Sequence, residues 1–408
     1  MKKISKSIKV LSLFLCMVIT WTSIAMPVSA VNSTTALAMG IDVSKHNQAI
    51  NWGQVASSGV KFAFIKAGST NKGLDPFYDA NMRGAQAAGI KTGVYLYSYA
   101  TNVEQAQNEA NLLLSWMSNY TVNYPVVYDV EDACMRGLST QQVQDMINTF
   151  CSTIYAAGYY PMVYSFKNLY LGKIGNVGYD KWVAQYSDHC DYPGDISIWQ
   201  SSSHGSIAGV PTRVDIDYTY KDYGAIIIAD GFTQRNGQTY FYAGYKMQRG
   251  WIATNDTRYY LDGNGILQKG IWFADAAGTY YLSPQDGSIS RGACTINKRD
   301  YFFNQDGILQ AGPITRPDGL TCYYNPSDGG AMMHGWINDG TNLYYAADDG
   351  HMVTGVNTIN KKAYFFNEHF ILQTNQQLTL DGVLYQADAQ GVLSPVPVVD
   401  SAAVPAKQ

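Results

Sequence analysis

Asp129 and Glu131 are two carboxylate residues that close an apolar run in the stretch YPVVYDVED, residues 124–132. Valine and tyrosine dominate the run and Pro125 stands at its entry, which indicates a β-strand. Side chains two residues apart share one face of a strand, with Cα atoms roughly 6.5 Å apart. That separation is on the scale of the carboxylate pairs that cleave glycosidic bonds. The alternative, which implies no catalytic role, is that both residues lie in a solvated loop after the strand.

The elements that would position this pair are eight short apolar segments before residue 220. They lie at residues 40–44, 61–67, 91–100, 124–131, 159–166, 181–186, 196–200 and 213–218, and helical patterns cover 75–89, 102–120 and 139–158. This alternation predicts an α/β fold built as an eight-stranded β/α barrel. Short loops between the later strands leave little room for helices, so the barrel should be irregular. Capping boxes are expected at Thr101 with Glu104 and at Ser139 with Gln142.

Four acidic residues fall on this frame at positions that suit catalysis. Asp42 lies in the first strand, Asp129 and Glu131 end the fourth, and Asp215 lies in the eighth. Catalytic groups of such barrels stand at the carboxyl ends of the strands, and the eighth strand neighbours the first when the barrel closes. Four carboxylates then converge on one mouth, in a chain with 32 tyrosines among 408 residues. This convergence favours a sugar-cleaving site over four separate structural acids.

The first thirty residues have the pattern of a secretory signal peptide. Four lysines precede an apolar stretch from about Val10 to Ile24, and Val28-Ser29-Ala30 has the small-residue cleavage pattern. A retained membrane anchor is the alternative, but the stretch is short for a spanning helix. We therefore expect residues 1–30 to be removed, residues 31–38 to be a linker, and the mature protein to be secreted without a membrane segment.

Charge and cysteine content narrow the class of protein further. Removing the four lysines leaves 24 Lys and Arg against 32 Asp and Glu, a net charge of −8. A nucleic-acid partner is not expected, because phosphate binding requires a basic patch. The five remaining cysteines have neither disulfide-scaffold nor zinc-ligand spacing. At most one or two disulfides could form, and Cys134 with Cys151 is the nearest pair.

Eight motifs, in order across residues 39–223, resemble glycoside hydrolase family 25, the N-acetylmuramidases. They are GIDVSKHN at 40–47, NWGQV at 51–55, FAFIKAG at 62–68, DPFYDANMRGAQAAGIKTGVYLYSYA at 75–100, YDVE at 128–131, WVAQY at 182–186, WQ at 199–200 and VDIDY at 214–218. The resemblance implies an incomplete β/α barrel over residues 39–228. It also implies hydrolysis, without metal or other cofactor, of the β-1,4 bond from N-acetylmuramic acid to N-acetylglucosamine in peptidoglycan.

Residue roles follow from the same resemblance. The acid/base glutamate of the family matches Glu131, its partner matches Asp129, and two further catalytic aspartates match Asp42 and Asp215. We expect the neighbouring Asp129 carboxylate and the apolar strand to raise the pKa of Glu131. Sugar-contacting or wall positions of the groove, with barrel core as the alternative for each, are Tyr95, Tyr164, Trp182, Tyr186 and Trp199.

Three positions depart from the family pattern. Ser69 replaces a glutamate, Leu96 replaces a histidine, and Asp217 occupies a place where the family often has asparagine. The first two changes affect the groove, so substrate preference or rate is in doubt more than the class of reaction. His46 stays as a candidate groove residue, although a lone histidine is more often a surface or packing residue.

Residues 231–391 follow a different pattern, a repeat of about 21 residues. Aromatic pairs recur at 259–260, 280–281, 302–303, 323–324, 344–345 and 365–366, and Asp-Gly pairs just after them suggest hairpin turns. Hairpins of this size cannot bury a face alone, so they must stack into an all-β solenoid. The Pro- and Ala-rich residues 392–408 are expected to be a disordered tail.

The repeats resemble choline-binding and glucan-binding cell-wall repeats, in which aromatic rings cage a quaternary ammonium or stack on sugar. Only some units keep the tryptophan, since Ala293, Ile314 and Val356 stand near the corresponding places. The ligand could be wall polysaccharide or teichoic acid, and the alternative is that the rings are mostly the core of the solenoid.

Together these features predict a secreted, cell-wall-associated peptidoglycan hydrolase with a wall-anchoring array. Two other classes stay open. One is a non-catalytic protein that binds wall glycan, against which the presence of both Asp129 and Glu131 argues. The other is a hydrolase of a different amino-sugar polymer, such as chitin.

Overall fold

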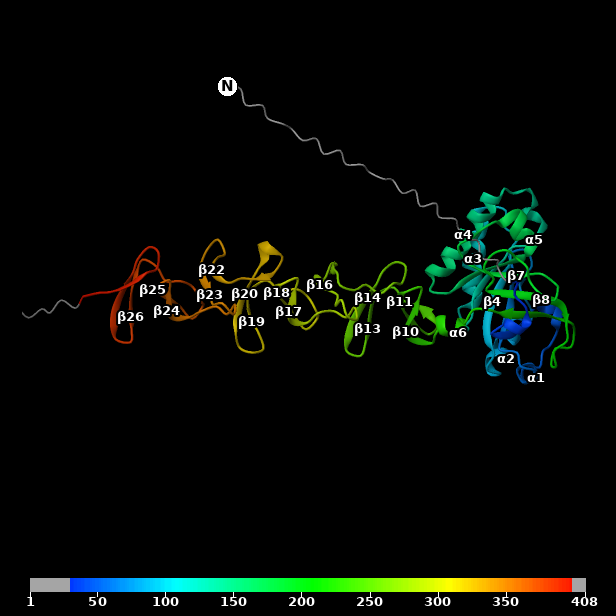
Figure 1. The fold of residues 1–408 in the computed structure, drawn as a ribbon, viewed down its shortest axis with the longest axis horizontal. Helices are drawn as coiled ribbons and strands as arrows, with labels where there is room; N and C mark the ends of the chain where they lie inside the picture. The colour runs from blue at the N-terminus through cyan, green and yellow to red at the C-terminus, as the bar shows by residue number, and fades with distance from the viewer. Residues whose placement is uncertain (1–29, 398–408) are drawn as a thin grey trace, which may run out of the picture. The chain divides into compact units, whose positions relative to one another are not determined.

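The computed structural model describes residues 30–397, so nearly all of the predicted signal peptide and the end of the predicted tail lie outside it. The chain divides into two compact units between Ile227 and Ile228. Figure 1 shows α-helices in the N-terminal unit and successive hairpins in the C-terminal unit. No helix within the described range is both long and apolar enough to cross a bilayer.

Eight strands close into a barrel in the N-terminal unit, as the sequence predicts. They are β1 (Ala38–Val43), β2 (Phe62–Ser69), β4 (Lys91–Tyr97), β5 (Val126–Asp129), β6 (Pro161–Phe166), β7 (Asp180–Ala184), β8 (Ile198–Gly205) and β9 (Val214–Thr219), with β3 (Gly73–Leu74) as a short hairpin partner of β2. Each pairs with the next, and β9 returns to β1.

The last strand gives the barrel its irregularity. Neighbouring strands are parallel from β1 to β8, whereas β9 is antiparallel to both β8 and β1. A parallel crossover needs a dozen or more residues, and only residues 206–213 separate β8 from β9. The short connection therefore reverses the chain, so that the start of β9 lies beside the ends of the parallel strands.

Helices cover the outside of the barrel. The α-helices are α1 (Trp52–Ser57), α2 (Tyr78–Ala87), α3 (Val103–Met117), α4 (Thr140–Ala156), α5 (Lys167–Leu169) and α6 (Tyr223–Ile226). The 3₁₀-helices are η1 (Ser33–Thr35), η2 (Lys45–Asn47) and η3 (Ala133–Gly137), and η4 (Tyr170–Ile174) is a π-helix. On α3 the buried residues Ala106, Ala110, Leu113 and Met117 recur at helical spacing, which turns one apolar face to the core.

One of the two predicted helix caps is correct. At α4 the Ser139 hydroxyl accepts from the Gln142 amide at 3.2 Å, and the Gln142 side chain accepts from the Ser139 amide at 2.9 Å. The box predicted at Thr101 with Glu104 is wrong by one residue. Asn102 caps α3 by accepting from the Gln105 amide at 2.9 Å, because asparagine is among the best N-cap residues.

The segment predicted as a linker is hydrogen-bonded to the barrel. Val31 and Cys190 exchange two backbone hydrogen bonds, at 3.1 and 2.8 Å, and the Tyr220 hydroxyl donates to the Asn32 carbonyl at 2.9 Å. Residues 31–37 are therefore part of the first unit. All five cysteines of the described range are free, so the possible pair Cys134 and Cys151 is not bridged.

The C-terminal unit is a row of antiparallel sheets of two or three strands. Its strands are β10 (Asp230–Arg235), β11 (Gln238–Ala243), β12 (Lys246–Met247), β13 (Gly250–Thr254), β14 (Thr257–Leu261), β15 (Trp272–Ala274), β16 (Thr279–Tyr281), β17 (Gly292–Ile296), β18 (Arg299–Phe303), β19 (Gly312–Thr315), β20 (Thr321–Asn325), β21 (Ala331–Met332), β22 (Gly335–Asn338), β23 (Leu343–Ala346), β24 (Gly355–Ile359), β25 (Lys362–Phe366), β26 (Gln376–Leu380), β27 (Val383–Ala387) and β28 (Leu393–Pro395), and η5 (Pro326–Asp328) follows β20. The strand β28 pairs with β27 inside the range predicted as a tail.

The predicted Asp-Gly pairs do not form the turns of the two-stranded hairpins, but Asp328-Gly329 does lie in the turn between β20 and β21. The chain reverses before the aromatic pair, for example at Asn255 and Asp256, whose φ angles are 50° and 61°. Two consecutive positive φ angles are the signature of a type I′ hairpin turn. The Asp-Gly pair at 262–263 lies in the following connection, where the Asp262 side chain accepts from the amides of Asn264 and Ile266 at 2.9 Å.

Successive hairpins share their cores, as a solenoid requires. One buried cluster joins Tyr301 and Phe303 of β18 with Ala331 of β21, and Tyr281 of the preceding hairpin packs against it. A single hairpin has too little apolar area for such a core, so each unit depends on its neighbours.

Candidate active site

An open hollow of about 230 Å³ at the mouth of the barrel contains all four predicted carboxylates. We call it the active-site hollow. Its lining residues are Asp42, Ser44, His46, Lys66, Tyr95, Tyr97, Asp129, Glu131, Tyr164, Phe166, Trp182, Tyr186, Gln200 and Asp215. Asp42 and Asp129 lie near the carboxyl ends of parallel strands. Asp215 reaches the same mouth because it lies near the start of the reversed strand β9, directly opposite Asp42.

Four of the five predicted aromatic residues line the active-site hollow, namely Tyr95, Tyr164, Trp182 and Tyr186. The structure does not bring Trp199 to it. That side chain is 1% exposed within the core, and its indole N–H donates to the Gln185 carbonyl at 2.8 Å. Alternation along β8 explains the difference, because Trp199 and the lining residue Gln200 are adjacent and face opposite sides of the strand.

Gln200, which the sequence analysis did not single out as a site residue, connects several groups of the hollow. Its side-chain N–H donates to Asp42 at 2.7 Å, and its carbonyl accepts from the hydroxyls of Tyr164 at 2.8 Å and Tyr186 at 3.0 Å. The Trp-Gln pair at 199–200 is the sequence signal that marks this residue, because its glutamine lines the hollow. Gln200 fixes both tyrosine rings relative to Asp42.

Lys66 is another lining residue that the sequence analysis does not single out. Its ammonium group lies 4.7 Å from the centre of the Tyr97 ring and 5.6 Å from that of Tyr95. Its positive charge lowers the pKa of both Asp129 and Glu131, against the effect of burial. Lys66 therefore acts electrostatically on both members of the carboxylate pair.

Glu131 follows the end of β5 and is half-buried, whereas Asp129 is 4% exposed. Burial, with smaller contributions from Asp132 and Asp215, raises the pKa of Glu131 to about 7. Burial also raises the pKa of Asp129 well above its usual range, and repulsion from Glu131 raises it further. The prediction that the Asp129 carboxylate raises the pKa of Glu131 therefore needs correction. Burial is the main cause for Glu131, and the repulsion within the pair raises the pKa of the more deeply buried Asp129.

One oxygen of Asp129 has no hydrogen-bond partner within the described structure, although it is buried. Buried polar atoms are almost always paired, so such an atom at an active site needs an explanation. Because Asp129 lines the active-site hollow, this oxygen is suited to accept a hydrogen bond from a donor on the substrate.

Asp217 lies beneath the active-site hollow and is fully buried. One of its oxygens accepts from the Trp182 indole N–H at 2.8 Å, and the other has no hydrogen-bond partner within the described structure. Burial raises the pKa of both Asp42 and Asp217 well above the usual range. Repulsion from Asp215 raises both further, and repulsion from Asp217 adds to the effect on Asp42.

A closed β/α barrel whose mouth holds clustered carboxylates, one with a pKa near neutrality, has the organisation of a glycoside hydrolase. The model of glycosyl hydrolases family 25 matches residues 41–210, and that of the putative cell wall binding repeat matches residues 250–267 and 334–352. Lysozyme M1 of Streptomyces globisporus is 31% identical over 199 residues, which cover 44% of this chain and 67% of that protein.

Two further proteins are similar to part of this chain. The uncharacterized protein YegX of Escherichia coli is 29% identical over 189 residues, covering 44% of this chain and 68% of that protein. The solved structure of the modular autolysin LytC from Streptococcus pneumoniae is 29% identical with a TM-score of 0.41, covering 45% of this chain and 46% of that one. The chain belongs to glycosyl hydrolases family 25 and is a glycoside hydrolase of the lysozyme type.

The pKa of Glu131 can be measured directly, because the chain has only four glutamates. With glutamate labelled by ¹³C at the side-chain carboxyl, one resonance should titrate with a midpoint near pH 7. Glu131→Gln should remove that resonance and so assign it. Asp215→Asn should lower the midpoint, because the charge of Asp215 is one of the contributions that raise it. A Glu131 midpoint near the ordinary value of about 4.3 would contradict the prediction.

Asp217→Asn should stabilise the protein at neutral pH. The folded-state pKa of Asp217 is raised, so the folded protein binds the proton more tightly than the unfolded chain. Stability is therefore lost as the pH rises from about 4 through the folded-state pKa. Asparagine keeps an oxygen for the Trp182 indole and removes this penalty. Tm at pH 7 should rise by at least about 2 °C, and the gain should vanish near pH 3.

The control for this variant is Asp188→Asn at an exposed position of the barrel unit. It makes the same chemical change without relieving burial, so its Tm should match that of the wild type at both pH values. A lower Tm for Asp217→Asn at pH 7 would show that the buried charge is needed by the fold.

Proposed function

We propose that this protein is a secreted N-acetylmuramidase that cleaves the β-1,4 bond from N-acetylmuramic acid to N-acetylglucosamine in peptidoglycan. The observation that carries the proposal is the half-buried Glu131, with a pKa of about 7, beside the buried Asp129 in a hollow lined by tyrosines and tryptophan. The similarity to Lysozyme M1 supports the substrate class.

Glu131 acts as the general acid in this proposal. At pH values up to about 7 it holds a proton, which it gives to the glycosidic oxygen as the bond to the leaving sugar breaks. Positive charge then develops at the anomeric carbon. The unpaired oxygen of Asp129 suits either of two tasks, namely to steady that charge or to accept from the amide N–H of an N-acetyl group that attacks the carbon.

Gln200, Asp42 and Asp215 assist the pair in different ways. Gln200 holds the Tyr164 and Tyr186 hydroxyls, which suits a wall against which a sugar ring packs. Asp42 accepts from Gln200, and Asp215, whose pKa burial raises to about 6, contributes negative charge at the opposite side of the same strand pair. Both lie further from the proton transfer than Glu131 in this scheme.

The C-terminal unit serves as the wall anchor in this proposal, through clusters of aromatic rings around single tryptophans. Trp336 is 40% exposed, with the rings of Tyr345 at 5.3 Å, Tyr364 at 5.0 Å and Phe366 at 6.0 Å between centroids. Trp272 is 39% exposed and has a similar set from its own and the following hairpin. Such partly open rings suit a quaternary ammonium group or a sugar face.

The other units are less suited to a cationic ligand. Around Trp251 the Arg258 guanidinium already lies 4.3 Å from the tryptophan ring and 5.7 Å from that of Tyr280. Ala293 and Val356 pair with Phe302 and Phe365 in the register that Trp251 has with Tyr260. In the β19–β20 hairpin the residue after the first glycine is Pro313, one position before the Ile314 that the sequence analysis places near the missing tryptophan. The aromatic clusters centred on Trp272 and Trp336 are therefore the candidate ligand sites.

Glu131→Gln should cost on the order of the 10²–10⁴-fold that a positioned general acid contributes, or more, because glutamine keeps the shape but cannot give a proton. Turnover is measured on soluble peptidoglycan fragments by mass spectrometry, which also identifies the new reducing end. Muramic acid at that end supports the proposed bond, and glucosamine contradicts it. Glu104→Gln, the same change on the exposed face of α3, should leave turnover unchanged.

Asp129→Asn should also be severe, and the double variant should lose little more than the worse single variant, because the two residues act as one unit. Asp42→Asn and Asp215→Asn should fall between these and the wild type. Folded Glu131→Gln protein that kept more than about a tenth of the wild-type turnover would rule out its assignment as general acid.

Wall binding should depend on the C-terminal unit. A chain that ends at Ile227 should cleave soluble fragments at the wild-type rate yet sediment poorly with intact walls, because several weak sites act together by avidity. In the full chain, Trp336→Ala should weaken sedimentation, whereas Leu384→Ala, an exposed side chain elsewhere in the array, should not. Release by choline would identify a quaternary ammonium ligand. Equal sedimentation of the short and full chains would contradict the anchoring role.

A further inference from the structure

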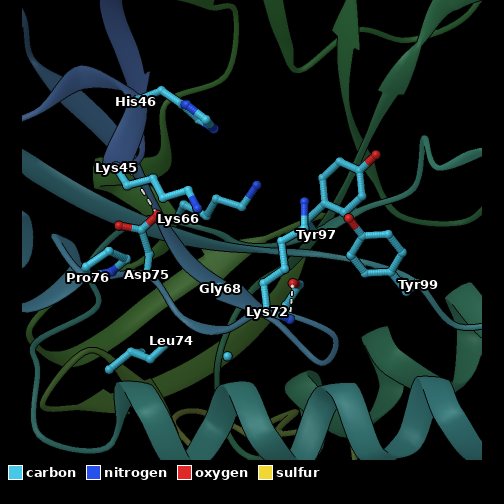
Figure 2. Close-up of a pocket in the computed structure, with 12 residues that line it drawn as sticks. Lys45, His46, Lys66, Gly68, Lys72, Leu74, Asp75, Pro76, Tyr97 and Tyr99 are labelled. Atoms are coloured by element: carbon cyan, nitrogen blue, oxygen red, sulfur yellow. Dashed lines mark hydrogen bonds between the residues drawn. The ribbon is translucent and has the colours of Figure 1, made fainter.

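A second hollow of about 250 Å³ adjoins the active-site hollow and shares His46, Lys66 and Tyr97 with it. Its other lining residues are Lys45, Gly68, Ser69, Lys72, Gly73, Leu74, Asp75, Pro76 and Tyr99. Figure 2 shows the side chains of Lys45, Lys66 and Lys72 reaching into the same space. We call this space the lysine hollow. The proposed muramidase function does not use it.

The lining of the lysine hollow has an excess of positive charge, with three lysines and one aspartate. Among residues 30–397, none of the ammonium groups of Lys45, Lys66 and Lys72 forms an ion pair. The one acidic lining residue, Asp75, is 6% exposed and committed to the backbone. It accepts from the Lys45 amide at 3.0 Å and from the Phe77 amide at 2.9 Å.

Short, constrained elements hold these lysines. Lys45 begins η2, where the Ser44 side chain accepts from the His46 amide. Lys72 lies in the β2–β3 hairpin, and its amide donates to the Ser69 hydroxyl at 3.2 Å. At Gly68 a Cβ atom would lie 2.2 Å from the Gly73 carbonyl oxygen, so only glycine permits so close a return of the chain. Lys45 and Lys72 are thus held by short, ordered connections, and Lys66 by strand β2.

Two tyrosine rings complete the lysine hollow. The Lys66 ammonium lies 4.7 Å from the centre of the Tyr97 ring, and that of Lys72 lies 5.9 Å from the centre of the Tyr99 ring. The Tyr97 hydroxyl donates to Asp132 at 3.1 Å, which fixes this ring on the boundary between the two hollows. The rings offer apolar faces and the lysines offer charge, so the hollow suits a small group with a short carbon chain and an anionic end.

We propose that the lysine hollow binds a carboxylate of the peptide that peptidoglycan carries on its muramic acid residues. This inference rests on the proposed function. A glycan whose cleaved bond lies at Glu131 brings the substituents of the adjacent sugar to the neighbouring hollow, and the free carboxylates of the peptide are the anionic groups attached there. None of the three lysine ammonium groups forms an ion pair within the described residues, so an entering carboxylate gains attraction from all three.

The test uses two matched substrates and the full-length protein. Both are tetrasaccharides of alternating N-acetylglucosamine and N-acetylmuramic acid with alanyl-glutamate peptides, and they differ only in whether the peptide carboxylates are free or amidated. The wild type should have a KM at least about tenfold lower for the free acid, with similar kcat, because charge-assisted hydrogen bonds stabilise binding. Lys45→Gln/Lys72→Gln should raise the KM for the free acid to that of the amide, without changing the kinetics on the amide.

Two controls isolate the charge. Lys45→Arg/Lys72→Arg keeps both positive charges and should keep most of the preference for the free acid. Lys61→Gln removes an exposed lysine just before the start of β2, outside both hollows, and should change nothing. Raising the salt concentration should reduce the wild-type preference but not the kinetics on the amidated substrate.

The outcomes separate this inference from the proposed function. No cleavage of either tetrasaccharide by the wild type would overturn the proposed function itself. Cleavage of both with equal KM, or an equal loss on both substrates in the glutamine double variant, would overturn only the carboxylate site. Stronger competition by a glycerol phosphate oligomer than by the free alanyl-glutamate peptide would also overturn it, in favour of a phosphate ligand.

Discussion

The pairing of β9 with β1 is the contact on which the catalytic unit depends. It closes the barrel, and its antiparallel register sets Asp215 directly opposite Asp42. A parallel β9 would carry residue 215 to the other end of the barrel, away from Glu131. The short connection after β8 forces the reversal, so chain length between two strands decides which acids meet.

Closing the barrel also buries acidic groups, and the structure compensates for this in two ways. Gln200 donates a hydrogen bond to Asp42 and the Trp182 indole donates one to Asp217, and Lys66 lowers the pKa of the Asp129 and Glu131 pair. Lys66 lines both hollows, so one cation influences the proton on the proposed acid and the field of the adjoining lysine hollow. Occupation of that hollow by an anion would weaken the effect of Lys66 and favour the protonated form of Glu131.

Much of this arrangement can be predicted from the sequence, because the eight strands are runs of β-branched and aromatic residues between turn signals. The four carboxylates could be placed for the same reason. The direction of β9 could not be predicted, because a run of apolar residues looks the same in a parallel and in an antiparallel strand. For Trp199 the sequence leaves groove and core both open, and the structure places it in the core while the adjacent Gln200 lines the hollow. The lysine hollow was not foreseen, because Lys45 and Lys72 come from separate loops.

The shared cores of the C-terminal unit have a consequence for how such a chain can change over generations. Each hairpin offers its successor a similar apolar face, as Tyr281, Phe303 and Ala331 do in one cluster that spans consecutive hairpins. A tandem duplication or deletion of one whole period therefore leaves every remaining junction intact. Unequal recombination can lengthen or shorten the array without redesigning a core, and single units can lose their tryptophan while neighbours keep theirs.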